Sequence, residues 1–195
     1  MPQWKDEIRD LAQGLARAPQ VAPGEIPDLE IYMDQLTTYL DKRLNFYSRE
    51  GDAPFVTKSM VNNYSKAGLL PPPLAKRYNR IHVMTLALVC QLKRLFTIQD
   101  LGKLLAPVAG EEGTGRLYRL FLEAQGEAFA KTPELAEQLL SALGEDEDPA
   151  RAKAALVTQL AVRAQRDLLL AEKILDTIPR EEEDPKTKKK KKQGA

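Results

Sequence analysis

Apolar residues recur every three or four positions along most of the chain, which is the spacing of one face of an α-helix. In the first third of the sequence this spacing predicts helices over residues 3–17, 29–46 and 58–67, the second of them capped by Asp28. The run 81–96 is apolar at almost every position, and a helix that is apolar all round is a buried one. The pattern therefore predicts an all-α protein with a central, buried helix.

The second half of the chain continues the helical pattern. A short helix capped by Thr97 is predicted over 98–105, and two further helices are predicted over 114–143. Asp148 can cap a helix and Pro149 is favoured at a first helical position, so a long helix is expected to begin there and to reach about Ile178. At 1.5 Å per residue this helix is roughly 45 Å long.

Small and apolar residues follow the long helix at alternating steps of four and three, which is a heptad repeat. The alanines of the repeat permit close approach of a second helix, and a homodimer interface is one interpretation. Its expected contacts are Val157, Ala161, Ala164, Leu168, Ala171 and Leu175. Packing of the same face on the protein's own helices is the alternative, and the pattern leaves both open.

Charge is distributed unevenly although the formal net charge is only +1. Residues 57–103 contain eight Lys or Arg and one Asp or Glu, whereas the flanking residues 1–56 and 104–185 are acidic overall. A basic segment of this kind is typical of binding to a polyanion such as nucleic acid. Pairing of the segment with the protein's own acidic flanks is the alternative. Residues 180–195 carry a lysine run and little to bury, so we expect them to be disordered.

The chemistry available to the chain is narrow. Cys90 and His82 are the single cysteine and histidine, so neither a disulfide framework nor a Cys- or His-based metal site is expected. No glycine-rich phosphate loop occurs, and the sequence predicts neither a cofactor nor an enzyme. The first residues are charged and no uncharged apolar run reaches about eighteen residues, so we expect a cytoplasmic protein without a membrane partner.

The predicted helix 58–67 separates two kinds of side chain. The face expected to point inward is apolar, with Met60, Val61, Tyr64 and Ala67. The opposite face carries hydroxyl, amide and ammonium groups and no acid, with Lys58, Ser59, Asn62, Asn63 and Lys66. Asn pairs well with the adenine edge in the major groove of DNA, and Lys reaches guanine or phosphate. Thr57, at the helix start, is expected to add a phosphate contact.

A second basic group follows this helix. Gly68 is placed to end the helix in the left-handed conformation, and the three prolines 71–73 must then run extended. Beyond the prolines, Tyr78 stands among basic residues, namely Lys76, Arg77 and Arg80. A short basic loop can lie on the DNA backbone or reach the minor groove. Together with residues 57–66, this loop forms the predicted site for double-stranded DNA.

The segment from Thr57 to Pro71 resembles the recognition-helix signature of MerR-type transcription regulators. Tyr64 matches the second tyrosine of that signature, and Gly68-Leu69-Leu70 stands in place before the proline. Residues 77–82 resemble the end of the wing, and 97–105 resemble the short helix after it. The resemblance implies a winged helix-turn-helix over about residues 54–105. Asn62 and Asn63 replace the arginine and first tyrosine of the signature, so no base preference is implied.

A closer resemblance is to an uncharacterised bacterial family of the domain-of-unknown-function type. Its members carry a Tyr-Met-Asp-Gln block, a Thr-Lys-x-Met-x-Asn-Asn-Tyr-x-Lys block and Leu-Leu-Pro-Pro-Pro, and all three stand within residues 27–105. Because no activity is established for the family, this resemblance supports the fold more than the function.

The sequence therefore predicts four parts, which are an N-terminal helix and linker at 1–26, a MerR-like winged helix-turn-helix domain at 27–107, a helical packing or dimerisation region at 108–179 and a charged tail at 180–195. The predicted function is that of a DNA-binding transcription regulator that reads the major groove with helix 58–67. A protein-interaction or adaptor module on the same scaffold, without DNA binding, is the alternative. The DNA target and any small-molecule effector are not specified by the sequence.

Overall fold

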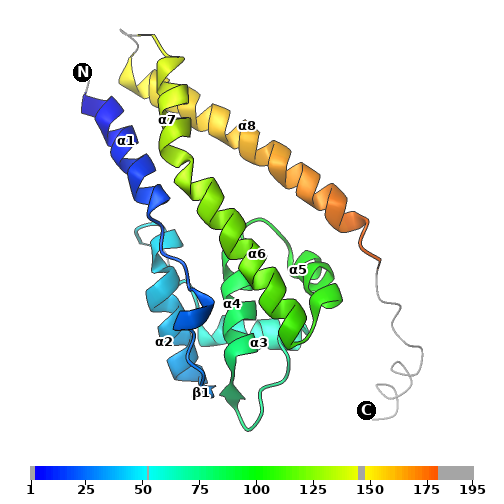
Figure 1. Cartoon of the computed structure of the whole chain (residues 1–195). Helices are drawn as coiled ribbons and strands as arrows, with labels where there is room; N and C mark the ends of the chain where they lie inside the picture. The colour runs from blue at the N-terminus through cyan, green and yellow to red at the C-terminus, as the bar shows by residue number, and fades with distance from the viewer. Residues whose placement is uncertain (1–2, 52, 145–147, 180–195) are drawn as a thin grey trace.

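The computed structural model describes residues 3–51, 53–144 and 148–179. This part of the chain consists mainly of helices with one ribbon of two short strands (Figure 1), and the all-α prediction is confirmed for it. The helices are α1 (Gln3–Ala16), α2 (Met33–Leu44), α3 (Lys58–Lys66), α4 (Arg80–Leu92), α5 (Ile98–Leu105), α6 (Glu111–Ala130), α7 (Thr132–Ser141) and α8 (Pro149–Asp176). The shorter elements are the 3-10 turns η1 (Pro23–Glu25), η2 (Asn45–Tyr47) and η3 (Ala106–Val108) and the strands β1 (Ile31–Tyr32) and β2 (Arg77–Tyr78).

α4 lies at the centre of the main core, as its almost continuous apolar sequence predicts. Every residue from His82 to Cys90 is buried, and the side chains around them come from α2, α3, α5 and α6. The core extends beyond residues 27–107, because Tyr118 and Leu122 of α6 belong to the same cluster. The Tyr118 hydroxyl donates a hydrogen bond of 2.6 Å to the Val21 carbonyl and so fastens the N-terminal linker to α6.

α2 begins later than the sequence predicts. The helix starts at Met33, and Asp28 does not cap it. Residues 31 and 32 instead form β1, which pairs antiparallel with β2, so the backbone before α2 is extended. The Gln35 side chain accepts a hydrogen bond from the Tyr32 backbone N–H at 2.9 Å and fixes this helix start. Leu29, the first residue of the predicted helix, is 75% exposed because it precedes the observed one.

The start of α6 also differs from the prediction, which placed it near residue 114. The helix begins at Glu111, after Gly110 with a φ of +100°. Gly113 makes this early start sterically feasible, because an ideal Cβ at that position would lie 2.5 Å from the Val108 carbonyl oxygen. The first turn of α6 therefore packs directly on η3. The short helix α5, by contrast, has the predicted bounds and the predicted Thr97 cap.

A second, smaller apolar cluster lies between α1, α7 and α8, at one end of the molecule in Figure 1. Trp4 of α1 is buried there beside Leu139, Leu140 and Leu156. Two ion pairs border the cluster, Arg9 with Glu137 at 2.7 Å and Lys153 with Glu7 at 2.9 Å. α6 and α7, separated by one residue, connect this cluster to the main core. The described helices include none with the length and hydropathy needed to cross a bilayer.

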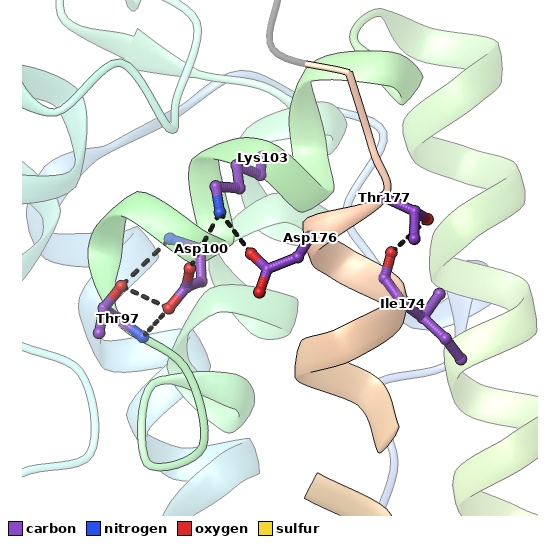
Figure 2. A network of polar contacts seen from close by, with 6 residues as sticks. All are labelled: Thr97, Asp100, Lys103, Ile174, Asp176 and Thr177. Carbon is purple, nitrogen blue, oxygen red and sulfur yellow. Dashed lines mark hydrogen bonds and ion pairs between the residues drawn. The ribbon is translucent and has the colours of Figure 1, made fainter. Parts of the chain in front are cut away.

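α8 begins with the predicted Asp148 cap and leaves the second cluster to end beside α5. There the Lys103 ammonium contacts the Asp176 carboxylate at 3.0 Å (Figure 2). The predicted heptad face is covered unevenly, because Leu175 is buried whereas Val157 is 65% exposed. Its other members grade between these extremes, with Leu168 and Ala171 half-buried and Ala161 and Ala164 exposed. The charged tail predicted at 180–195 lies outside the described residues.

Candidate nucleic-acid interface

The start of α3 is defined by a side-chain cap. Thr57 has an extended backbone, and its hydroxyl accepts a hydrogen bond from the Met60 backbone N–H at 3.2 Å. Val56 precedes this cap and Val61 lies four positions into the helix, which is the spacing of a hydrophobic staple. Both valines are buried in the main core. The chain therefore enters α3 at a fixed angle, and the helix begins directly after Thr57, as predicted.

The end of α3 is equally well defined. Gly68 has a φ of +75°, as predicted, and its N–H donates to the Ser65 carbonyl at 3.1 Å. The Leu69 N–H donates to the Tyr64 carbonyl at 3.0 Å, which completes a Schellman motif. Leu69 and Leu70 are buried and pack the chain back onto the core. α3 is therefore a short helix held at both ends.

The inward face of α3 holds the helix on the core. Val61 and Tyr64 are buried, and Met60 is partly buried against them. Loss of solvent around the Tyr64 hydroxyl raises its pKa to about 12. Ala67, predicted to face inward, is exposed because it lies at the helix end, one residue before the chain turns at Gly68.

The outward face of α3 carries the groups that the sequence assigns to DNA. Ser59, Asn62, Asn63 and Lys66 are exposed, and their side chains make no hydrogen bond or ion pair with any described residue. The face is not free of neighbouring acid, however, because Lys58 forms an ion pair with Asp34 of α2. The sequence prediction overlooked this carboxylate because α2 and α3 lie side by side only in the folded chain. Both partners are more than half exposed, and such surface pairs contribute only about 0–1 kcal/mol.

A tight hairpin lies after the three prolines. Leu74 bridges to Arg77, and the two residues between them, Ala75 and Lys76, both have positive φ values of 49° and 62°. Two successive left-handed residues are typical of the turns that match the twist of a β-hairpin. Lys76 is thereby placed at the exposed tip, and no described residue contacts its ammonium group.

The other side chains around this hairpin that were predicted to contact DNA interact with residues of the protein itself. Arg77 lies 3.6 Å from a Glu30 carboxylate oxygen and 5.6 Å above the Tyr32 ring, although it stays exposed. Arg80 donates a hydrogen bond of 2.8 Å to the Pro23 carbonyl. Tyr78 is 5% exposed and contributes to the core rather than to the surface. Side chains on a strand alternate between its two faces, so an outward Arg77 requires an inward Tyr78.

Three residues that the sequence analysis missed position α3. The Asp41 carboxylate accepts a hydrogen bond of 2.6 Å from the Phe55 N–H. From the other side, the Lys93 ammonium donates to the Phe55 carbonyl at 2.9 Å and lies 4.6 Å from the centre of its ring. The loop between α2 and α3 is therefore held from α2 and from the end of α4. The apolar pair Phe55-Val56 beside the Thr57 cap is the only local signal of this anchor.

His82 fixes the backbone on the far side of α3. Its Nε2 lies 3.1 Å from the Pro71 carbonyl, and its Nδ1 lies 3.1 Å from the Asn79 backbone N–H. Because a carbonyl can only accept, the Nε2–H donates to Pro71. Nδ1 also lies 2.7 Å from the Asn79 side-chain oxygen. Burial lowers the pKa of His82, and the bond to Pro71 opposes that shift only in part. The His82 ring thus ties the proline segment to the start of α4.

The described residues include no group of three or more His, Cys, Asp or Glu side chains placed to hold a metal ion. Cys90 is buried, and burial raises the pKa of its thiol to about 12. The functional groups at the outward face of α3 and the hairpin tip are therefore hydroxyls, amides and ammonium ions. These groups bind by hydrogen bonding and charge.

The fold and its surface define a small helical domain in which a capped nine-residue helix and a β-hairpin project from an apolar core. Residues 21–121, slightly more than half of the chain, match the family described as domain of unknown function DUF1836, and the chain belongs to this family. Neither the curated proteins nor the solved structures contain a match to the chain.

Proposed function

We propose that the protein binds double-stranded DNA by placing the outward face of α3 in the major groove, as a transcription regulator with a MerR-like winged helix-turn-helix. The observation that carries the proposal is the set of unpartnered groups on α3. Asn62 and Asn63 can each pair with an adenine edge, and Lys66 can reach a guanine or a phosphate. Ser59 and Thr57, at the helix start, are placed for phosphate contacts.

The hairpin supports the same proposal. In this arrangement it acts as the wing, and Lys76 at its tip reaches the DNA backbone or the minor groove. Arg77 is exposed and joins it by leaving Glu30, a weak partner at 3.6 Å. Arg80 and Tyr78 act within the protein by holding the hairpin on η1 and the core. The interface that we propose therefore has two parts, α3 and the wing tip.

A homodimer through α8 is the assembly that we propose for this regulator. The exposed heptad positions Val157, Ala161 and Ala164 offer a small, apolar surface to a second copy, as in a coiled coil. Leu168, Ala171 and Leu175 are partly or wholly covered within the chain, so the contact is centred on the first half of the helix. Analytical ultracentrifugation of Val157→Asp is expected to give a monomer, with Gln159→Asp as the matched control.

A protein-interaction module is the second candidate function. One observation favours it, which is the apolar groove of about 340 Å³ between α1, α7 and α8. Leu11 and Leu15 on its rim are 65% and 43% exposed. A helix of a partner protein is the natural occupant of such a groove. An isolated complex with one stoichiometric protein partner and no nucleic acid supports this alternative.

Selection of bound duplexes from a random-sequence pool, followed by fluorescence anisotropy on the enriched sequence, tests the DNA proposal. Affinity is expected to fall with salt with a log–log slope of about −0.9 per phosphate contact. Asn62→Ala is expected to cost about 1–3 kcal/mol of binding and to relax selectivity at one base pair. Lys66→Ala should reduce the salt slope by about one contact if it binds a phosphate. Absence of duplex binding at low salt contradicts the proposal.

Three control variants and one further test variant make the test sharper. Gln165→Ala and Lys173→Ala remove an exposed amide and an exposed ammonium from α8, and neither is expected to change binding. Asp34→Asn removes the carboxylate beside Lys58 and is expected to tighten binding about 2- to 5-fold at low salt, because one repulsive charge near the phosphates is lost. Glu172→Gln is its matched control on α8. Equal effects of Asp34→Asn and Glu172→Gln place the interface elsewhere.

A further inference from the structure

A cavity of about 680 Å³ lies under the C-terminal end of α3. Its walls come from the proline segment 71–73, from α4, from the end of α5 with η3, and from the start of α6. Most of the lining is apolar, with Leu70, Ile81 and Leu105 among the larger side chains. Pockets for small molecules typically measure about 300–1,000 Å³ and combine an apolar wall with a few placed polar groups. The cavity has the size of such a pocket.

The polar group that sets this cavity apart is the hydroxyl of Thr85. Thr85 is only 4% exposed and lines the cavity from α4. It makes no hydrogen bond with any residue of the described ranges. Every fully enclosed side-chain oxygen or nitrogen in those ranges, by contrast, has a hydrogen-bond partner. The Thr85 hydroxyl must therefore be reached from the cavity, where it is a donor and acceptor in an otherwise apolar wall.

Other polar groups of the lining are also neutral. Ser65 contributes a hydroxyl that is unpartnered in the described structure, and the Thr114 hydroxyl makes only a long bond of 3.4 Å to the Val108 carbonyl. Gly110, which precedes α6, and Thr114 in its first turns are the lining residues from this end of the cavity. No charged side chain lines the cavity. Glu111 and Glu112 in the first turn of α6 oppose the approach of an anion.

We propose that this cavity is a binding site for an uncharged, mainly apolar small molecule that carries an oxygen acceptor for the Thr85 hydroxyl. The apolar wall favours a ring or a branched carbon skeleton. The neutral lining disfavours an ion, because a charge placed there would lose water without gaining a counter-charge. The inference stands on the cavity alone and does not require that the protein bind DNA.

The experiment uses the full chain and three neutral probes, 2-phenylethanol, cyclohexylmethanol and N-methylbenzamide, with binding followed by saturation-transfer NMR. At least one probe is expected to bind saturably, with a Kd on the order of 1–10 mM for fragments of this size. Phenylacetate and 2-phenylethylammonium, which share the skeleton of the first probe, are expected to bind at least about tenfold more weakly. Failure of all three neutral probes, or stronger binding by either ion, overturns the proposal.

Variants locate the bound probe. Thr85→Val keeps the shape of the side chain and is expected to weaken binding at least about threefold while the midpoint of thermal unfolding is retained. Gly102→Leu fills the cavity from α5, where an added Cβ makes only an ordinary contact of 3.7 Å with Leu69, and it is expected to abolish binding. Leu11→Asp disrupts the separate groove between α1, α7 and α8. Binding that survives Gly102→Leu and is lost in Leu11→Asp overturns the proposal.

Discussion

The main core around α4 and the cluster of α1, α7 and α8 differ in how completely they cover their apolar side chains. In the core, Leu36, Leu40 and Leu86 are 0% exposed. Along α8, by contrast, Val157 at the edge of the second cluster is 65% exposed, and Leu169 and Leu170, which lie beyond that cluster, are 48% and 58% exposed. The family match at 21–121 spans the core and stops within α6. The core therefore covers its apolar side chains within one set of helices, whereas α8 leaves part of its apolar face exposed.

The sharpest test of this difference is a matched pair of leucine substitutions. Leu86→Ala is expected to lower the free energy of unfolding by about 2–5 kcal/mol, because the core cannot refill the space of a fully buried leucine. Leu169→Ala makes the same chemical change on α8 and is expected to cost less than about 1 kcal/mol. Urea denaturation followed by circular dichroism measures both. Similar losses would show that α8 is packed as tightly as α4 in solution.

Two glycine substitutions test the same difference between a tightly packed and an open position, this time at the backbone. Gly113→Ala is expected to destabilise the protein by about 1–3 kcal/mol, since the new Cβ collides with the backbone of η3. Gly14→Ala, in α1, adds its methyl group into open space and is expected to stabilise by up to about 1 kcal/mol through helix propensity. Thermal unfolding of the two variants should therefore shift in opposite directions. A neutral Gly113→Ala is incompatible with the close approach of α6 to η3.

The Thr57 cap tests whether α3 is a rigid part of the core. Thr57→Ala is expected to cost about 1 kcal/mol of stability, because the Met60 N–H loses its acceptor. Thr38→Ala is the control, since Thr38 is exposed on α2 without a side-chain partner in the described structure. Hydrogen exchange should also show faster exchange at the start of α3. An unchanged exchange rate there would mean that the valine staple alone holds the helix.

The single histidine provides a smaller, pH-dependent test. Burial lowers the pKa of His82 in the folded state, whereas the unfolded chain titrates near about 6.5. Between these two values the unfolded state binds more protons, so stability rises with pH through this window and falls when the pH drops below about 6.5. The slope cannot exceed about 1.4 kcal/mol per pH unit for one proton. NMR titration of the ring gives the folded pKa directly, and a value at or above about 6.5 contradicts the lowering of the His82 pKa by burial.

Local signals were sufficient for much of the fold. The Thr97 and Asp148 caps, the Gly68 stop and the start of α3 after Thr57 could all be predicted, because each depends on residues within one turn of helix. The buried helix was predicted over 81–96 from its apolar run, and α4 ends four residues earlier, at Leu92. The start of α2 could not be predicted, because it depends on pairing between β1 and a strand more than forty residues away. The resemblance of residues 77–82 to the end of a wing was the sequence signal of that strand, and it did not name the partner strand.

The same difference between local signals and contacts of distant segments explains which parts of the candidate site could be predicted. The outward face of α3 follows from helical spacing, so its residues were predicted and are exposed. Asp34 beside Lys58, the anchor of Phe55 by Asp41 and Lys93, and the burial of Tyr78 all depend on contacts between segments. A basic segment in the sequence therefore overestimates the basic surface, because part of its charge is used to hold the domain together.

The smallest expected effect concerns the far end of α8. Asp176 contacts Lys103, which also lies 3.8 Å from Asp100, the carboxylate that accepts from Thr97 at the start of α5 (Figure 2). Bonding to the Thr97 hydroxyl lowers the pKa of Asp100, so this carboxylate stays charged and shares the lysine. Asp176→Asn is thus expected to cost only about 0.2–1 kcal/mol. Asp167→Asn, which breaks a pair between neighbours on α8, is the control.

The size of the Asp176→Asn effect shows whether burial or charge attaches the end of α8 to α5. If Leu175 supplies most of the attachment, Asp176→Asn changes stability slightly and Leu175→Ala changes it more, because Leu175 is buried and Asp176 is 72% exposed. Increasing the salt concentration should then leave the Leu175→Ala loss unchanged and remove the Asp176→Asn loss. The reverse ranking would mean that α8 is tethered at this end by charge alone. In that case salt would release the helix, and the exposed heptad face would become longer.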